Sequence, residues 1–505
     1  MENFYKTNGY LDFRIIDYKI TKRDEKDILY VYIYEGERKI IKEISLLPDS
    51  FNYLLKFLKK KMPFYYSEDI LSQFEEKLYT YFTNNGFIFF NYERIEEKKA
   101  DTLKILYNLK PGKKIKIKEI KVLGLSQKTR KKIALDAIEL KEGEYISFDK
   151  IYISIKNLYS LGIIKSVSYE ILPNSDSTEA VISFNLREEK MRALRTGYGY
   201  SSDGFSQAKF ELEHLNIFNN AQKLALLTRF QFNSKIFLHE EMSIRYQDPN
   251  FVIRKNILEL LPFYYIDRIE DVRRFGFQSR YIIKRNFWVF ENSFIWQNIK
   301  SIEKGEDLFY LNGMGFSYSQ DLRDNILNTK SGYYFHSYIN TYGSIFGGTE
   351  NIIKIGYSYS FFETVKTYTF AFKISGGHVI PYLPTEIVPY SERFLLGGEG
   401  SLRGVKRYSV GDFDIRGIRS GTNFYLFNFE ARKFLTDYLQ FVLFFDTGTN
   451  SNIFSYKSFR NNAFGFGIGI RYYFGILPFR IDFATNNHFL KTKEVFLYLG
   501  LGQSF

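Results

Sequence analysis

The residue types that perform most enzyme chemistry are missing or scattered in this sequence. It contains no cysteine, which excludes disulfides, thiolate metal sites and a cysteine nucleophile. No two of its five histidines stand at the spacing of paired metal ligands. Ser337 follows His336, but no recognisable spacing joins a base to a nucleophile. We therefore expect no enzyme activity, no bound metal and no cofactor.

The glycine-rich segment FLLGGEGSLRG, residues 394–404, is the most distinctive short motif. Gly397, Gly398 and Gly400 permit a tight backbone excursion with positive φ. The spacing is not the GxxxxGK[ST] of a phosphate-binding loop, and no helix is expected after it. Phosphate binding is therefore not expected, and the role of the segment depends on the elements that hold it.

Length and composition limit what those elements can be. A chain of 505 residues is too long for one ordinary domain. A mean hydropathy of −0.26 and the lack of an 18-residue apolar run exclude transmembrane helices, but not a transmembrane β-barrel. The net charge of +13 is spread along the chain and not clustered on one segment. We therefore expect no nucleic-acid partner.

Residues 1–190 contain only seven of the 35 glycines and carry an internal repeat. The sequence IKEI occurs at 41–44 and again 76 residues later, at 117–120. In each copy this strand pattern precedes a helical stretch (51–61 or 127–140), an amphipathic helix that ends at Gly86 or Gly162, and two strands. We predict two β-α-α-β-β repeats, over residues 40–112 and 113–190.

The first residues resemble the end of such a repeat. Asn8 and Gly9 precede two strand patterns, as Asn85 and Gly86 do. We expect residues 1–39 to form the C-terminal part of a repeat that lacks its first strand and both helices and that begins upstream of Met1. The alternative is a shortened repeat that leans on its neighbour.

Residues 191–505 alternate with period two, as β-strands do. In residues 464–472, one face is apolar and consists of Phe464, Phe466, Ile468, Ile470 and Tyr472. The other face consists of Gly465, Gly467, Gly469 and Arg471. A small and polar second face is typical of a crowded or hydrated barrel lumen. Sixteen strands leave about 19 residues each, against about 9–11 for a membrane crossing. Fourteen or eighteen strands fit almost as well. The alternative fold is a soluble sandwich or propeller, which the aromatic content of 19% disfavours.

Four motifs, which occur in order behind the repeats, resemble the BamA/TamA superfamily of outer-membrane assembly factors. Residues 321–332 resemble its mid-barrel strand and turn, residues 394–404 its loop 6, residues 444–448 its inward strand motif, and residues 496–505 its aromatic-ended last strand. The resemblance implies an α+β region of periplasmic POTRA repeats followed by an all-β transmembrane barrel of 16 antiparallel strands.

The resemblance also implies a site inside the barrel. It assigns the loop 6 tip to Ser401, Leu402, Arg403 and Gly404, and the strand that accepts the loop arginine to Phe444, Asp446 and Gly448. A buried arginine needs a carboxylate partner, which Asp446 can provide to Arg403 through two hydrogen bonds. The alternative is that both are ordinary solvated lumen charges. Val405 stands where the family has an aromatic residue, which leaves the packing of the tip open.

The last expected feature is a lateral seam between the first and last barrel strands. The candidate seam residues are Gly197, Gly199, Gly500, Gly502 and Phe505. Glycines weaken strand pairing, so such a seam can open and a client strand can pair with the first strand. The alternative is that these glycines only relieve crowding inside the barrel.

The resemblance implies a factor that inserts or secretes β-barrel or autotransporter-type clients through this seam. It implies an outer membrane of a Gram-negative-type bacterium, with the POTRA repeats in the periplasm. The expected partners are unfolded client proteins, outer-membrane lipid, and a periplasm-spanning or lipoprotein partner. A TamA-like factor is the first expectation, and a BamA-like core insertase or a two-partner secretion transporter is the alternative. A passive porin is least favoured, because porins lack the repeats.

Overall fold

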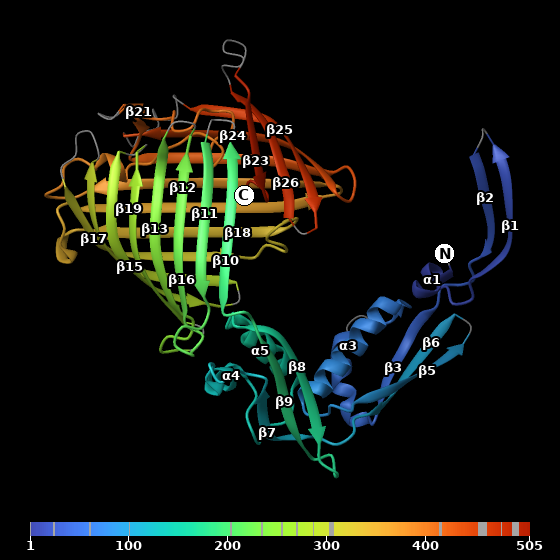
Figure 1. Cartoon of the computed structure of the whole chain (residues 1–505). Helices are drawn as coiled ribbons and strands as arrows, with labels where there is room; N and C mark the ends of the chain where they lie inside the picture. Colours follow the sequence, from blue (N-terminus) through green and yellow to red (C-terminus); the bar gives the residue numbers. More distant parts are fainter. Residues whose placement is uncertain are drawn as a thin grey trace. The chain divides into compact units, whose positions relative to one another are not determined.

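The computed structural model describes residues 2–23, 26–59, 62–99, 101–201, 205–233, 236–253, 256–268, 271–285, 287–301, 308–413, 417–452, 462–475, 477–486 and 494–505. The chain forms two compact units, Met1–Glu189 and Lys190–Phe505 (Figure 1), which divide one residue before the expected boundary of the barrel. The finer boundaries at 39/40 and 112/113 stay predictions. Within the described ranges, no helix is both long enough and apolar enough to cross a membrane.

The first unit contains the two predicted repeats one after the other, and each has its own sheet and helices. The earlier copy consists of β3 (Ile40–Leu47), η1 (Asp49–Leu55), α2 (Lys56–Lys59), β4 (Phe64–Tyr65), α3 (Glu68–Asn84), β5 (Asn91–Lys99) and β6 (Thr102–Lys110). The later copy consists of β7 (Lys116–Leu123), α4 (Lys131–Ala137), α5 (Phe148–Ser160), β8 (Ile164–Pro173) and β9 (Glu179–Glu188). The strand orders are β4-β3-β6-β5 and β7-β9-β8, with the first strand of each copy parallel to the last.

Each sheet is covered on one face by the amphipathic helix of its repeat. On α3, Leu71, Phe74 and Leu78 recur at helical spacing and are buried. On β6, alternate residues such as Leu103 and Ile105 are buried against them. Burial of these two stripes explains why the helix and the sheet form together.

The first helix of each repeat is shorter than the sequence predicts. The stretch 127–140 forms a helix only over Lys131–Ala137, because α5 binds the backbone beyond it. Ser154 Oγ accepts from the Glu139 N–H at 2.8 Å, and Asn157 Nδ2 donates to the Ala137 carbonyl at 3.1 Å. The stretch 51–61 divides into η1 and α2, and its residues 60 and 61 lie outside the described residues.

The N-terminal segment corrects one expectation. The sequence pattern predicts that this segment lacks both helices, but Glu2–Thr7 forms the short helix α1. Gly9, Gly86 and Gly162 follow α1, α3 and α5 with positive φ of 97°, 90° and 71°, a conformation that favours glycine. A two-stranded hairpin follows, formed by β1 (Arg14–Arg23) and β2 (Lys26–Tyr34).

The second unit is an antiparallel barrel whose sixteen strands follow in chain order, as predicted (Figure 1). The strands are β10 (Arg192–Ser201), β11 (Phe205–His214), β12 (Lys223–Phe232), β13 (Phe237–Asp248), β14 (Asn256–Asp267), β15 (Val272–Lys284), β16 (Trp288–Ser301), β17 (Phe309–Asp321), β18 (Gly332–Tyr342), β19 (Ile352–Val365), β20 (Tyr368–Pro381), β23 (Asn423–Phe434), β24 (Leu439–Ser451), β25 (Ala463–Phe474), β26 (Leu477–Asn486) and β27 (Phe496–Leu501). The barrel closes between β27 and β10.

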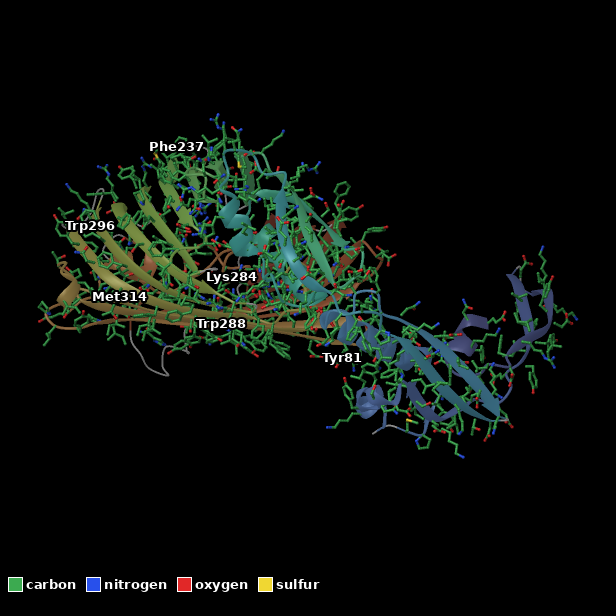
Figure 2. The ribbon with its side chains drawn as sticks, turned by 90° about the horizontal axis from the view of Figure 1, so that it is seen from below. Tyr81, Phe237, Lys284, Trp288, Trp296 and Met314 are labelled. Atoms are coloured by element: carbon green, nitrogen blue, oxygen red, sulfur yellow. The ribbon has the colours of Figure 1, made fainter. Side chains whose placement is uncertain are left out.

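The alternation along each strand separates an apolar outer face from the lumen. On β25, Phe466 and Ile468 are exposed on the outside, whereas Gly469 and Arg471 are buried on the inside. Trp296, which is 39% exposed, is one of many large side chains on the outer wall (Figure 2). An apolar outer face and a polar inner face are what a barrel in lipid requires.

The longest connection in the barrel joins β20 to β23, and we call residues 382–422 loop 6. It contains the 3₁₀ turn η3 (Tyr390–Glu392), a small pairing of β21 (Asp412–Phe413) with β22 (Arg419–Ser420), and the glycine-rich segment 394–404. Its contacts with lumen-facing residues of the barrel strands form the candidate functional site.

Candidate functional site

The tip of loop 6 is a compact turn built on glycines. Gly397 and Gly398 have positive φ of 113° and 91°, as expected, whereas Gly400 does not, which corrects the expectation for that residue. The Ser401 Oγ accepts from the Gly397 N–H at 2.9 Å. Leu402 is fully buried, so an apolar side chain fixes the turn from inside.

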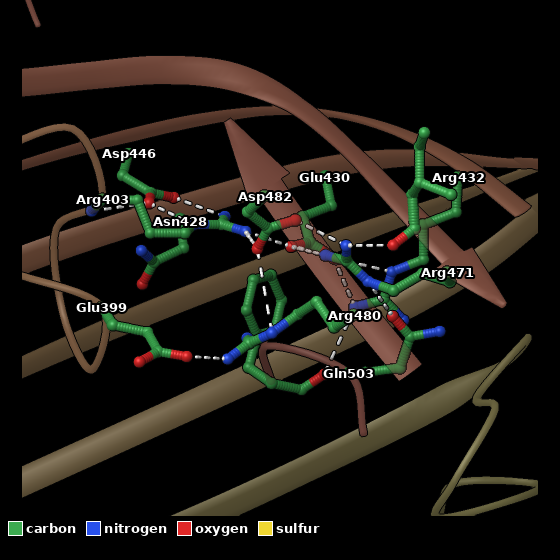
Figure 3. A network of polar contacts seen from close by, with 12 residues as sticks. Glu399, Arg403, Asn428, Glu430, Arg432, Asp446, Arg471, Arg480, Asp482 and Gln503 are labelled. Atoms are coloured by element: carbon green, nitrogen blue, oxygen red, sulfur yellow. Dashed lines mark hydrogen bonds and ion pairs between the residues drawn. The ribbon is translucent and has the colours of Figure 1, made fainter. Parts of the chain in front are cut away.

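Arg403 and Asp446 form the ion pair that the sequence predicts (Figure 3). Arg403 Nε donates to Asp446 Oδ2 at 2.7 Å and Nη2 donates to Oδ1 at 3.0 Å. The Arg403 backbone N–H also donates to Oδ2, at 3.1 Å. Both side chains are essentially buried, with 1% and 0% exposed. This geometry excludes the alternative of two ordinary solvated charges.

The arginine has two further carboxylate partners that the sequence analysis missed. Arg403 Nη1 donates to Glu430 Oε1 at 2.6 Å and lies 3.4 Å from Asp482 Oδ2. Its guanidinium also stacks on the Phe444 ring, 3.7 Å from the ring centre. Phe444 therefore belongs to the site as predicted, but as a stacking surface.

More arginines compensate these carboxylates. Arg432 Nε donates to Glu430 Oε2 at 2.8 Å, and Arg471 Nη1 donates to Asp482 Oδ1 at 2.5 Å. Together with a contact between Glu399 and Arg480, the cluster joins four arginines to four carboxylates (Figure 3). Matched charges make such burial tolerable, since an uncompensated buried charge is costly.

A sequence signal for these partners exists. Glu430 and Arg432 stand two apart on β23, and Arg480 and Asp482 stand two apart on β26. Residues two apart on a strand share a face, so opposite charges at this spacing on lumen-facing positions indicate an internal ion pair.

Small residues on β25 make room for the tip. A Cβ at Gly465 would lie 1.8 Å from the Arg403 carbonyl oxygen, and one at Gly467 would lie 2.5 Å from the Phe444 ring. Gly448 on β24 also faces loop 6, at a greater distance, since a Cβ there would meet the Leu396 side chain at 3.1 Å. These lumen-facing glycines therefore leave the space that the tip of loop 6 and the Phe444 ring occupy.

The remaining tip residues dock on neighbouring strands. Gly404 is tied at both backbone atoms, because its N–H donates to the Tyr498 hydroxyl at 3.4 Å and its carbonyl accepts from Asn486 Nδ2 at 2.8 Å. The Ser401 carbonyl accepts from Asn428 Nδ2 at 2.9 Å. Val405, which replaces the family's aromatic residue, packs in the apolar cluster around Leu402.

A second anchor, absent from the sequence analysis, holds the ascending part of loop 6 on another part of the wall. Arg274 of β15 donates to Glu392 Oε1 at 2.5 Å and to the Ser391 carbonyl at 2.8 Å. Lys354 of β19 donates to the second oxygen of Glu392 at 3.3 Å. Val388 adds an apolar contact to the wall. Loop 6 thus crosses the lumen between two charged anchors.

The seam lies where it is predicted, between β10 and β27. β10 pairs with β11 from Arg192 to Ser201, whereas the pairing described between β10 and β27 is Ser201 opposite Tyr498. Because antiparallel partners keep a constant sum of residue numbers, continued pairing would put Gly199 opposite Gly500. The same register would put Gly197 opposite Gly502. In a fully paired seam the four predicted glycines would therefore form two opposed pairs.

Crowding does not explain most of these glycines. A Cβ at Gly199 would meet nothing within 4 Å, and one at Gly197 would meet Lys209 only at 4.0 Å. Gly502 also has open space, but its φ is +90°. Gly500 is the exception, because a Cβ there would lie 2.9 Å from the Arg480 guanidinium.

A polar cavity of about 530 Å³ lies behind the seam. Gly199 and Gly500 line it from the strands, and Glu399 and Arg407 line it from loop 6. The sequence predicts Phe505 at the seam, but the structure places it elsewhere, against Phe362 on β19 with ring centres 6.3 Å apart.

Comparisons with known proteins agree with this architecture. The sequence model of the Omp85 superfamily domain matches residues 173–505, and that of the POTRA surface antigen variable number repeat matches residues 115–189. The outer membrane protein assembly factor BamA of Nitratidesulfovibrio vulgaris is 23% identical over 435 residues, which are 82% of this chain and 54% of that protein. BamA of Neisseria meningitidis is 22% identical over 49% of this chain and 32% of its own length. The chain therefore spans about half or less of the curated relatives it matches.

Solved structures show the same fold. The crystal structure of BamA from Haemophilus ducreyi lacking POTRA domains 1–3 has a TM-score of 0.69 at 15% identity, over 92% of this chain and 99% of that one. CdiB from Escherichia coli has a TM-score of 0.51 at 12% identity, over 98% and 94%. With the barrel and well over half of the sequence matched, this chain belongs to the Omp85 superfamily, as an outer-membrane barrel preceded by a periplasmic POTRA region.

Proposed function

We propose that this protein assembles or secretes β-rich outer-membrane clients by presenting the edge of β10 to a client strand. The observation that carries the proposal is the contrast in pairing along β10. Its ten residues are all paired on the β11 side, but on the β27 side the described pairing is confined to Ser201. An edge of free N–H and C=O groups is a template for another strand.

The seam chemistry supports the proposal. Gly197 and Gly199 sit in open space, so they lower the stability of pairing without filling a packing need. The two curated relatives named above are outer membrane protein assembly factors. The proposed clients are unfolded outer-membrane or autotransporter-type proteins, which would reach the edge from the periplasm and leave it through lipid.

The proposed mechanism involves no bond making or breaking in a substrate. Backbone pairing would supply the free energy, and no cofactor is required. A periplasm-spanning or lipoprotein partner would act at the POTRA repeats, whose outer strands β5 and β8 have one free edge within the described sheets.

Three roles within the family remain distinct proposals: a TamA-like factor, a BamA-like core insertase and a two-partner secretion transporter. The names of the curated relatives favour assembly over the export of one dedicated client. A passive porin is disfavoured because loop 6 crosses the lumen between the Arg403 and Glu392 anchors.

Depletion in the native host tests the function. Outer-membrane proteomes would be compared after depletion and after complementation with the wild-type protein. Loss of many β-barrel proteins would support a core insertase, and loss of a narrow set or one secreted protein would support a specialised factor. An unchanged proteome would overturn the proposal.

A photo-crosslinking residue tests the edge directly. Tyr198 on β10 is 71% exposed, and placing the crosslinker there should capture client precursors. Phe210 on β11 is 46% exposed but lies on a strand paired on both sides, so it is the matched control. Equal capture at both positions would contradict a role for the β10 edge.

A further inference from the structure

The turn between β17 and β18 belongs to the one family-like motif to which neither the docked loop 6 nor the seam gives a role. We call residues 322–331 the β17–β18 turn. The chain enters the barrel from the POTRA region at Arg192, and successive strands run in opposite directions. β17 and β25, the eighth and fourteenth strands, therefore both end on the periplasmic side. The turn thus lies at the periplasmic mouth of the lumen.

The β17–β18 turn is fixed in shape by its own polar side chains. Asp324 Oδ1 accepts from three backbone N–H groups of the turn, at 2.9, 3.0 and 3.2 Å. Asn325 Oδ1 accepts from two more, at 2.8 and 3.1 Å. The Thr329 hydroxyl donates to the Asn325 carbonyl at 2.6 Å, and Thr329 is almost fully buried. Such local bonds replace strand pairing and hold a turn in one conformation.

The base of the turn is fixed on the β17 side of the wall. Arg323 binds Asp321 through two hydrogen bonds, Nε to Oδ1 at 2.8 Å and Nη2 to Oδ2 at 2.7 Å. Gly332 ends the turn with a φ of +101°, and a Cβ there would lie 2.1 Å from a backbone carbonyl oxygen of the turn. The Lys330 carbonyl accepts from Thr364 Oγ1 of β19 at 2.8 Å. The base therefore has little freedom to move.

The far end of the turn reaches a different part of the barrel. Asn328 Oδ1 accepts from the hydroxyl of Tyr473, near the end of β25, at 3.1 Å. By the shorter way around the barrel, β25 is six strands from β17. With about 4.8 Å between neighbouring strands, that path along the wall is about 29 Å long. The ten-residue turn therefore meets Tyr473 across the mouth of the lumen and not along the wall.

Tyr473 is itself held in place to receive the turn. Phe434 packs on its ring, with ring centres 5.3 Å apart. Gln503 Nε2 donates to the Tyr473 hydroxyl at 2.8 Å. Because an amide nitrogen only donates, the single proton of this hydroxyl is left for Asn328. The bond across the mouth therefore has a defined direction, from Tyr473 to Asn328.

We infer that the β17–β18 turn is a bar across the periplasmic mouth, which keeps unfolded polypeptide out of the lumen. An unfolded chain needs a continuous opening to enter, and the turn divides the mouth. The turn cannot swing back to the β17 wall without breaking the bond between Asn328 and Tyr473. These two are therefore positioning residues for the bar. The further consequence, that clients stay at the edge of β10, rests on the proposed function.

A cysteine inside the barrel measures access through the mouth, because the chain has no cysteine of its own. Ser319 is eight residues from the buried Leu311 on β17, so it lies on the same, lumen-facing side. Ser319→Cys in the whole protein would be labelled with a small maleimide and with a maleimide on a polyethylene glycol chain. The ratio of the large-reagent rate to the small-reagent rate reports the opening. Tyr152→Cys on α5, where Tyr152 is 69% exposed, calibrates the two reagents outside the barrel.

Asn328→Ala in this background should raise the ratio about two- to tenfold, the factor expected from losing one hydrogen bond. Ile326→Ala is the matched control, because Ile326 is on the same turn with its side chain 67% exposed. It should leave the ratio unchanged. A turn that only stabilises the barrel would change the thermal midpoint in Asn328→Ala but not the labelling ratio, and that result would contradict the role of Asn328.

A shortened turn tests the bar without relying on one bond. Replacing residues 325–330 by Asn-Gly, which forms a two-residue hairpin turn, should raise the ratio at least as much. Heat-dependent gel mobility would verify that the barrel is folded. An unchanged ratio in the folded, shortened protein would overturn the inference. Labelling requires no client, so its outcome is independent of client capture at Tyr198, which tests the proposed function.

Discussion

The guanidinium of Arg403 and the carboxylate of Asp446 meet through two hydrogen bonds, at 2.7 and 3.0 Å, although 43 positions separate them in the chain. The pair ties the tip of loop 6 to β24 inside the barrel. Glu430 and Asp482 complete the surroundings of the same guanidinium. The Arg403 side chain therefore contacts three carboxylates and fixes the tip of loop 6 on the barrel wall.

Arg403→Ala should release the tip without unfolding the barrel. Removing one partner of a buried ion pair typically costs about 3–5 kcal/mol, and here it leaves three carboxylates with one arginine fewer. Heat-dependent gel mobility should be retained, while protease sensitivity within loop 6 increases and client assembly falls. Arg403→Lys keeps the charge but loses the fork geometry, so it should be intermediate. Full client assembly by Arg403→Ala would contradict a role for the docked tip.

Gly465→Ala should disturb the same tip from the opposite side. The added methyl would lie 1.8 Å from the Arg403 carbonyl, so the loop must shift, at a cost of about 1–3 kcal/mol. Gly400→Ala is the matched control, because a Cβ there meets nothing within 4 Å and its φ is not positive. The thermal midpoint and the loop 6 cleavage rate should change in the first variant only. An equal thermal midpoint and cleavage rate in the two variants would contradict the conclusion that Gly465 makes room for the tip of loop 6.

The architecture was predictable because it depends on periodicity. The alternation in residues 464–472 already separated an apolar face from a glycine face, and the structure puts these faces on the outside and in the lumen. The motif resemblance added the pairing of Arg403 with Asp446, which a periodic pattern alone does not specify.

The missed parts depend on contacts between residues far apart in the chain. Arg274 and Glu392 are 118 positions apart, and no local pattern marks either of them as a partner. The strand pattern before Phe505 predicts this residue at the seam, but the positive φ of Gly502 turns the chain away from the direction of β27. The sequence does not show whether a glycine lies in open space, as Gly199 does, or adopts a positive φ at a turn, as Gly502 does.

Valine at the β10 glycines should strengthen the seam. Gly197→Val and Gly199→Val place β-branched side chains where there is open space, and the change in strand propensity is up to about 1 kcal/mol per site. Client capture at the β10 edge should fall while the barrel stays folded. Gln207→Val, on β11 opposite Gly199, is the control because its strand is already paired on both sides. A similar loss of capture in the control would point to a general effect of valine on the lumen.

The ion cluster of the first POTRA-like repeat should make that repeat sensitive to acid. Arg94 Nη1 lies 2.9 Å from Glu68 Oε1 and 3.0 Å from Glu75 Oε1. Burial alone would raise the pKa of Glu68, but hydrogen bonds from Arg94 and Tyr66 hold it below its usual value of 4.5. The unfolded chain then binds more protons than the folded one, so this stabilisation is complete above a pH of about 4.5 and is lost as the pH falls through the lowered pKa.

A urea titration of the whole protein between about pH 7 and pH 3 would measure this loss. The unfolded fraction can be read from brief hydrogen-exchange labelling, at one fixed pH, of peptides from α3 and β5. Glu68→Gln should lower the midpoint near neutral pH and flatten its decline in acid, because the titrating group is gone. The control is the ion pair of Glu93 with Lys110, which is mostly exposed. Glu93→Gln should leave the urea midpoint and its pH dependence nearly unchanged, because exposed ion pairs contribute little stability. An equally steep decline in Glu68→Gln would show that other carboxylates govern the acid sensitivity of the repeat.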